Sequence, residues 1–190
     1  MVDHAADDRP HVLLFTDGAC IGNPGPGGWA FILTHPATGR SKESSGGEHA
    51  TTNNRMEILS VIRGLEALKG QSKVDLHSDS QYVVKAISDW LPNWKRCGWK
   101  KSAKAKLQIK NADLWQRLDE LLQSHEVRAQ WVKGHNGHAE NERCDELADA
   151  AAARISRTPT PVRANNPSPQ PADGLFANGA GNDNRIEDGQ

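Results

Sequence analysis

The pattern of apolar and polar positions predicts five strands. Short runs of β-branched and apolar residues stand at 11–16, 29–34, 74–77 and 127–132, and polar alternation at 40–48 is typical of an exposed edge strand. The first run stops at Asp17 and Gly18, which favours a turn there. Residues 23–28 consist of Asn, Pro and Gly and are typical of a connecting loop.

Helices are expected where apolar residues recur at intervals of three and four. The cluster Thr51-Thr52-Asn53-Asn54 and the residue Ser80 favour helix starts, because their side-chain oxygens can accept from free backbone N–H groups. Asn111 can cap a third helix, whereas Pro92 and Gly98 are expected to end the second. The expected helices span 52–68, 80–91, 111–122 and 142–155.

The order of these elements predicts an α/β fold. Three strands joined by short connections come first, and the remaining strands are separated by helices. Hairpin-linked strands pair antiparallel, while strands joined through helices pair parallel. A mixed sheet flanked by helices is therefore expected.

Composition limits the folded part of the chain. The 190 residues, 36% of them hydrophobic, fit one globular domain. From 156 to 190 there are five Pro, five Asn and four Gly but few large apolar side chains, which predicts a disordered tail. Residues 1–10 are expected to be a disordered lead, and 11–155 the folded domain.

The cysteines and the short apolar runs indicate a protein without disulfides, a zinc site or a membrane span. Cys20, Cys97 and Cys144 are far apart and lack a CxxC pair, so neither a disulfide framework nor a zinc site is expected. No apolar run approaches the roughly 20 residues of a membrane span, and the acidic N-terminus is unlike a signal peptide. We expect a cytoplasmic protein without a membrane partner.

Charge is distributed unevenly. The whole chain has 23 Lys and Arg against 24 Asp and Glu, a formal charge of −1, but residues 11–155 alone carry +2. Seven cations and no carboxylate lie within 95–110, a segment that we call the basic strip. They are Lys95, Arg96, Lys100, Lys101, Lys104, Lys106 and Lys110. Unopposed cations favour contact with nucleic-acid phosphates.

Four carboxylates occupy positions suited to metal chemistry. Asp17 and Asp79 each follow an apolar strand, Glu57 lies in the opening turns of a helix, and Asp145 adjoins the apolar stripe of the last helix. Each one alone is more often structural, as a turn residue or a partner of the helix dipole. Together they could bind hard cations such as Mg²⁺, and two such ions suit phosphodiester hydrolysis.

Distinctive strings of residues surround these carboxylates. They are Thr16-Asp17-Gly18-Ala19-Cys20 with Gly22-Asn23-Pro24-Gly25-Pro26-Gly27-Gly28, Thr51-Thr52-Asn53-Asn54-Arg55-Met56-Glu57, Ser78-Asp79-Ser80-Gln81-Tyr82-Val83, Trp131-Val132-Lys133-Gly134-His135 and Asn141-Glu142-Arg143-Cys144-Asp145-Glu146-Leu147-Ala148. In family order and over nearly all of 11–155, these strings closely resemble bacterial ribonuclease H type 1.

The resemblance implies a ribonuclease H-like fold, with a five-stranded mixed sheet flanked by helices. It also implies a metal-dependent endonuclease that hydrolyses the RNA strand of an RNA·DNA hybrid and leaves 5′-phosphate and 3′-hydroxyl ends. Asp17, Glu57, Asp79 and Asp145 match the family's ligands for two Mg²⁺ ions, with Asp17 bridging both, and Mn²⁺ is an alternative. His135 matches a histidine that assists proton transfer or product release.

Substrate contacts follow from the same resemblance. Positions that touch the minor groove of the hybrid match Cys20, Asn23, Asn53, Asn54 and Gln81, and Thr52 with Asn23 could contact a DNA-strand phosphate. The segment 90–110 matches the family's basic protrusion, which implies DNA-strand contacts for Trp90, Trp94, Lys100 and Lys101. The stretch between Trp99 and Asn111 is about two residues longer than in the commonest form of the family. Trp115 and Trp131, in contrast, are expected in the core.

Two alternative functions stay open at this point. One is a hybrid-binding module without catalysis, which the presence of all four carboxylates disfavours. The other is a DNA-processing nuclease of the same fold, such as an integrase, which the Asn-rich motifs and the Trp-containing protrusion disfavour. No obligate protein partner is expected, and a monomer is the default.

Overall fold

A five-stranded mixed sheet forms the centre of the protein. The computed structural model describes residues 8–134 and 137–159. The strands lie in the order β3-β2-β1-β4-β5, with β1–β2 and β2–β3 antiparallel and β1–β4 and β4–β5 parallel. Their bounds are β1 His11–Cys20, β2 Gly25–His35, β3 Arg40–Thr51, β4 Lys73–Ser78 and β5 Glu126–Trp131. The expected mixed sheet is confirmed.

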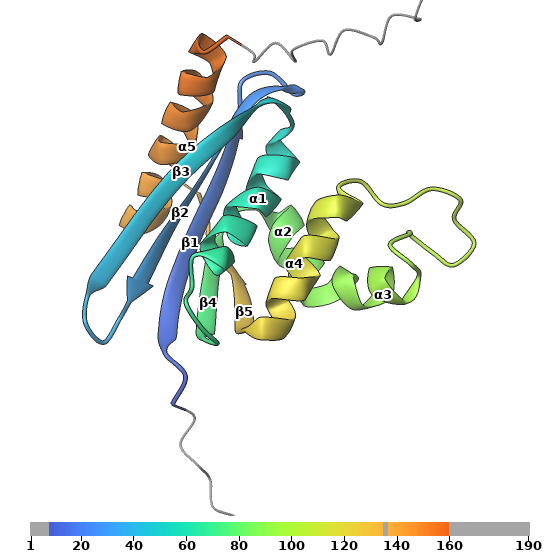
Figure 1. Cartoon of the computed structure of the whole chain (residues 1–190), viewed down its shortest axis with the longest axis horizontal. Coiled ribbons are helices and arrows are strands. Elements are labelled where there is room, and N and C mark those ends of the chain that lie inside the picture. Colours follow the sequence, from blue (N-terminus) through green and yellow to red (C-terminus); the bar gives the residue numbers. More distant parts are fainter. Residues whose placement is uncertain (1–7, 135–136, 160–190) are drawn as a thin grey trace, which may run out of the picture. The chain divides into compact units, whose positions relative to one another are not determined.

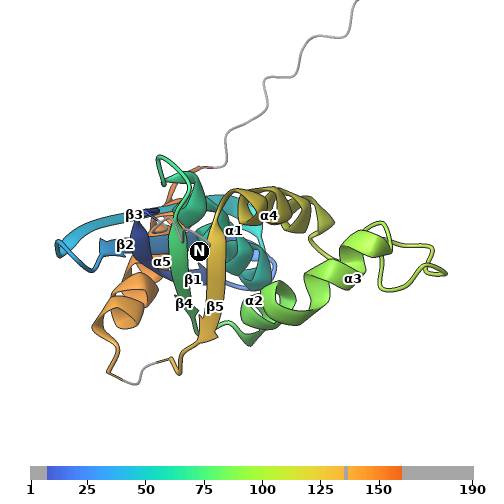
Figure 2. The ribbon, with the colours of Figure 1, turned by 90° about the horizontal axis from the view of Figure 1, so that it is seen from below.

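Helices cover both faces of the sheet (Figure 1, Figure 2). On one face, α1 (Asn53–Glu66) packs against β1 and β2, and α4 (Ala112–Ser124) packs against α1. On the other face, α5 (Ala139–Arg157) packs across β1, β2 and β3. Since α5 lies over the antiparallel half of the sheet, its residues can approach the carboxyl end of β1.

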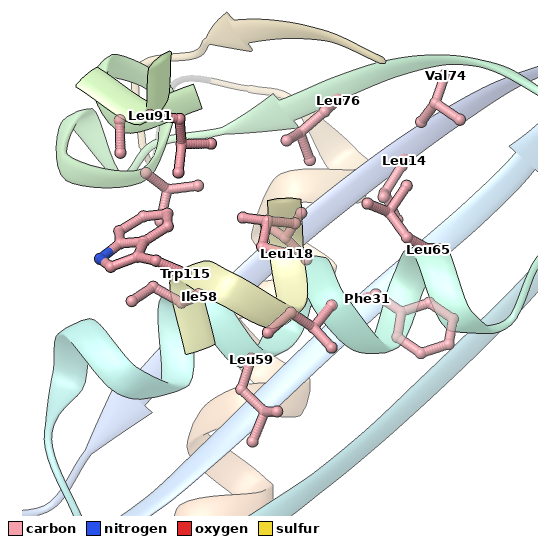
Figure 3. Packing of buried hydrophobic residues seen from close by; sticks show 14 of the residues in the cluster. Leu14, Phe31, Ile58, Leu59, Leu65, Val74, Leu76, Leu91, Trp115 and Leu118 are labelled. Carbon is pink, nitrogen blue, oxygen red and sulfur yellow. The ribbon is translucent and has the colours of Figure 1, made fainter. Parts of the chain in front are cut away.

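The larger core lies between the sheet and the pair α1 and α4 (Figure 3). Leu14 and Leu76 of the sheet, Ile58 of α1, and Trp115 and Leu118 of α4 are each fully buried. Burial of a leucine or isoleucine side chain contributes ~1.5–3 kcal/mol. The expected core position of Trp115 is confirmed, and this packing fixes the helices that carry the site.

β1 and β2 extend into residues that the sequence pattern predicted to form a turn and a connecting loop. β1 continues through Asp17 to Cys20, and β2 already begins at Gly25. The prediction of a turn at Asp17 is wrong because Asp17 pairs with Ala30, and Cys20 with Gly27, in the antiparallel ladder. The glycines therefore belong to strands, and Asp17 is held by sheet hydrogen bonds.

The segment after β4 also differs from the prediction. The expected single helix is three joined pieces: α2 (Gln81–Lys85), a π-helical turn η1 (Ala86–Trp90) and α3 (Leu91–Arg96). Pro92 does not end a helix but lies in the first turn of α3, where its missing N–H is tolerated. α3 and the loop after it project from the sheet (Figure 1).

Several element ends shift as well. α1 ends at Glu66, so Leu68 lies beyond it, and α5 begins at Ala139, three residues before the expected Glu142. Ser80 caps α2 as predicted, its hydroxyl accepting from the Val83 N–H at 3.4 Å. Asn111 precedes α4 in a left-handed conformation, φ 60°, and its side chain makes no capping bond.

The position of Trp131 contradicts the expectation of a core residue. Its side chain is 48% exposed. Trp131 ends β5, which is the edge strand of the sheet and pairs on one side only, with β4. An edge strand has no neighbouring strand on its outer side, and about half of the ring stays in contact with solvent.

The predicted lead and tail lie largely outside the described residues, namely at 1–7 and 160–190. Within 8–134 and 137–159, no helix combines the length and the apolar character that a bilayer crossing requires.

Candidate active site

Three carboxylates from three different elements meet at one end of the sheet. Asp17 comes from β1, Glu57 from α1, and Asp79 from the residue that follows β4. One ligand oxygen from each lies within 4.8 Å of the others. Asp17 and Glu57 are each only 6% exposed. The structure thus brings together three of the four predicted ligands, at the carboxyl ends of the parallel strands β1 and β4.

Gly18 allows Glu57 to approach Asp17. A Cβ atom at Gly18 would lie 2.3 Å from the backbone nitrogen of Glu57 and 2.4 Å from the carbonyl carbon of Met56. These are backbone atoms and cannot move aside without shifting α1. A glycine beside Asp17 therefore lets the first turns of the helix lie directly on the strand, which places both carboxylates in one cluster.

Asp79 is held by its surroundings on several sides. Its backbone oxygen accepts from the indole Nε1–H of Trp131 at 3.0 Å, and its Oδ2 accepts from Asn141 Nδ2 at 3.5 Å. A Cβ at Gly134 would lie 2.6 Å from the same Oδ2. Asn141 is 2% exposed and was not assigned a role from sequence. Its position four residues before Asp145, on the same helix face, was the available signal.

Asp145 adds the fourth carboxylate from α5. It acts on Asp17 through its charge and through a side-chain hydrogen bond. It is not part of the three-residue cluster defined by the 4.8 Å limit. All four predicted carboxylates therefore lie at one site, with Asp145 on the side of Asp17.

Burial and repulsion keep protons on this cluster. Burial, and next the charge of Asp79, raise the pKa of Asp17 from an ordinary 3.8 to about 8. Burial, followed by the charges of Asp17 and Asp79, raises the pKa of Glu57 well above its usual range. Such carboxyls are largely protonated at neutral pH, and a bound cation would favour their ionised form.

The donor set fits a divalent cation. Every ligand atom offered is a carboxylate oxygen, which hard ions such as Mg²⁺ prefer. Glu57 Oε2 is buried and has no hydrogen-bond partner among residues 8–134 and 137–159, while Glu57 Oε1 accepts from Asn53 Nδ2 at 3.4 Å. A buried oxygen without a donor is costly unless something else, such as a metal ion, satisfies it.

Predicted substrate residues line a pocket beside the carboxylates. Asn23, Thr52 and Asn54 share a pocket of about 450 Å³ with Lys110 and Asn111. The Asn53 backbone N–H donates to Asn23 Oδ1 at 3.3 Å, which ties the β1–β2 connection to the start of α1. Amides, a hydroxyl and one ammonium group in a concave site can bind a phosphate or a sugar hydroxyl.

Two further predicted substrate residues, Cys20 and Gln81, lie at the end of β1 and at the start of α2. The Cys20 thiol is directed at the backbone oxygens of Gly25 and Thr51, at 3.6 and 3.7 Å. Burial raises the pKa of this thiol, so it is not a thiolate nucleophile. Gln81 is exposed at the first residue of α2.

An aromatic groove leads from α2 to the projecting loop. It measures about 420 Å³ and is lined by Tyr82, Trp90, Trp94, Lys101, Ile109 and Lys110. The ring centroids of Trp90 and Trp94 are 5.4 Å apart, and Trp94 lies 5.6 Å from the buried Trp115. The predicted contacts Trp90, Trp94 and Lys101 therefore share one groove, whereas Lys100 lies outside its lining and pairs with Gln108 in a β-bridge.

One cation of the basic strip has a carboxylate partner. Lys95 pairs with Asp119 of α4 at 2.8 Å, because the fold brings α4 against α3. The exposed lysines of the loop, Lys101, Lys104, Lys106 and Lys110, remain available to an anionic ligand. His135 lies outside the described residues, so its predicted role stays a prediction. His138 precedes α5 and makes no side-chain capping bond.

The mixed sheet and the carboxylates at its strand ends define an α/β protein with a candidate divalent-metal site. A family model for RNase H matches residues 9–153. A ribonuclease H of Afipia carboxidovorans is 61% identical over 140 residues, which cover 74% of this chain and 91% of that relative. The chain therefore belongs to the ribonuclease H family.

Solved structures agree with this assignment. LC9-RNase H1, described as a type 1 RNase H with the type 2 active-site motif, has a TM-score of 0.67 and is 34% identical, covering 77% of this chain and 74% of its own. LC11-RNase H1, solved in complex with an RNA/DNA hybrid, has a TM-score of 0.58 at 22% identity. The match covers 75% of this chain and 97% of LC11-RNase H1. The second comparison shows the fold alone.

Proposed function

We propose that this protein is an endoribonuclease that hydrolyses the RNA strand of RNA·DNA hybrids with Mg²⁺, leaving 5′-phosphate and 3′-hydroxyl ends. The observation that carries the proposal is the convergence of Asp17, Glu57 and Asp79 within 4.8 Å, with Asp145 beside Asp17, in a chain of this family.

The four carboxylates would hold the metal. Bound Mg²⁺ supplies positive charge that activates water and stabilises the leaving oxygen of the phosphodiester. The chain's own residues set up this chemistry. Gly18 and the β1 backbone fix Asp17, Asn53 orients Glu57, and Asn141 holds the Asp79 carboxylate. Burial of Asp17 and Glu57 keeps bulk water from competing for their oxygens.

Two concave surfaces would hold the two strands of the hybrid. The pocket of Asn23, Thr52 and Asn54 offers donors and acceptors to phosphate and to the 2′-hydroxyls that distinguish RNA from DNA. The aromatic groove with Lys101 and Lys110 offers ring faces and charge to the DNA strand. His135, matched by the resemblance to a histidine of the family, would assist proton transfer or product release.

The test is a substrate panel of hybrid, duplex DNA and duplex RNA, each with one strand end-labelled and the hybrid labelled on its RNA strand, with Mg²⁺ and with chelator. We expect cleavage of the hybrid alone, only with Mg²⁺. Asp17→Asn should abolish cleavage while hybrid binding in Ca²⁺ persists. Asp149→Asn, an exposed Asp on α5, is the matched control and should retain activity. Wild-type activity of Asp17→Asn, or equal cutting of duplex DNA, would refute the proposal.

A further inference from the structure

Trp131 is an exposed indole placed next to a proposed metal ligand. It is 48% exposed, and its position pairs with Ser78, the residue directly before Asp79. The indole Nε1–H donates to the Asp79 backbone oxygen at 3.0 Å. This bond fixes one edge of the ring, so the ring is held in place beside the carboxylate cluster although it remains accessible.

The ring forms one wall of a separate groove. This groove measures about 320 Å³ and is lined by Trp131 together with Gln81, Val84 and Lys85 of α2. The three α2 residues share one helix face, because their spacing is three and four. Tyr82 of α2 instead lines the aromatic groove that leads toward Trp94 and Lys101. The two grooves thus have no lining residue in common.

The lining chemistry fits a nucleotide. A planar ring offers a surface for a base or a sugar, the Gln81 amide can bond a hydroxyl, and Lys85 supplies a cation with no carboxylate in the lining. The groove begins beside Asp79, where the RNA strand would be cut, whereas the Trp90 and Trp94 groove lies farther along the chain toward the basic strip. The RNA strand is therefore the better occupant.

We propose that Trp131, Gln81 and Lys85 form a subsite that holds one RNA nucleotide flanking the scissile phosphodiester. Trp131 packs on its base or sugar, and Lys85 contacts its phosphate. The proposal rests on the ribonuclease H function proposed above. It makes Trp131 a substrate-binding residue, where the sequence placed it in the core.

The cleavage profile of a hybrid tests this subsite. At internal positions the subsite is filled, but near one RNA end it is empty. We expect the wild type to cut slowly near that end, and Trp131→Ala to lower internal cleavage about 10-fold at subsaturating substrate while cleavage near that end is unchanged. Trp131→Phe keeps the ring but loses the N–H, and should retain most of the wild-type profile.

Three results would overturn the proposal. One is a uniform loss at all positions in Trp131→Ala, which indicates that only the bond to Asp79 matters. Another is equal loss in Trp131→Phe and Trp131→Ala. The third is no loss in either variant, which indicates that the groove serves a different ligand. Equal melting temperatures exclude misfolding, and absence of hybrid cleavage by the wild type would instead refute the proposed function.

Lys85 gives an independent readout. Lys85→Gln should lower the salt dependence of hybrid binding by about one phosphate contact. Arg128→Gln is the matched control, since Arg128 is a 75% exposed cation on β5 and lies outside this groove. An unchanged salt slope in Lys85→Gln would contradict a phosphate contact at this position.

Discussion

Asp17→Asn is expected to stabilise the protein in the absence of metal. Asp17 is 6% exposed and faces the charges of Asp79 and Asp145. An amide of the same shape is neutral at every pH, so it avoids the cost of keeping a carboxyl protonated, or of ionising it, in this cluster. Residues that bind a ligand are often poorly suited to the free folded state, and here the metal ligands repel one another without their cation.

The magnitude follows from proton linkage. Burial, and then Asp79, raise the pKa of Asp17 from 3.8 to about 8, so the folded state binds more protons than the unfolded state between these pH values. Stability contributed by this carboxyl is unaffected below pH 3.8, falls as pH rises, and stops falling above about pH 8. At ~1.4 kcal/mol per pH unit, the raised pKa of Asp17 lowers the free energy of unfolding by about 4 kcal/mol at pH 7. This is an upper limit, because water entry and relaxation reduce the effect.

Urea unfolding followed by circular dichroism at pH 5 and pH 8, with chelator present, measures this effect. Asp17→Asn should be more stable than the wild type by about 1–4 kcal/mol at pH 8, and by less at pH 5. Mg²⁺ should reverse the order, because it stabilises only the protein that binds it. Equal stability of the two proteins at pH 8, or an advantage of Asp17→Asn that does not grow with pH, would refute the reasoning.

Three further predictions concern packing and charge. Gly18→Ala should lower hybrid cleavage at least 10-fold in a gel assay, since its Cβ would meet the Glu57 backbone at 2.3 Å; normal activity would contradict the proposed close approach. Trp115→Ala should cost about 3–5 kcal/mol in urea unfolding, because a fully buried ring leaves a cavity, and a loss below 1 kcal/mol would be inconsistent with this. Replacing the four lysines between residues 100 and 106 by Ala should weaken hybrid binding and flatten its salt dependence, and binding that keeps its full salt slope would argue against phosphate contact.

Much of the fold was accessible from local pattern. The order of strands and helices along the chain, the mixed pairing and the apolar stripes of α1, α4 and α5 agree with the prediction from sequence. The positions of Asp17 and Asp79 after apolar strands also indicated a site at the carboxyl ends of β1 and β4. These features depend on residues close together in the chain, where side-chain spacing and turn chemistry act directly.

Other features depend on partners that are distant in the chain. Asp17 lies in a strand because β2 pairs with it, and Lys95 has a partner because α4 lies beside α3. Asn141 contacts Asp79 across 62 positions. Trp131 is exposed because β5 is an edge strand, although a large aromatic side chain is typical of a core. Local sequence thus specifies the elements and the carboxylates, while long-range packing sets their burial, their protonation and the surfaces open to substrate.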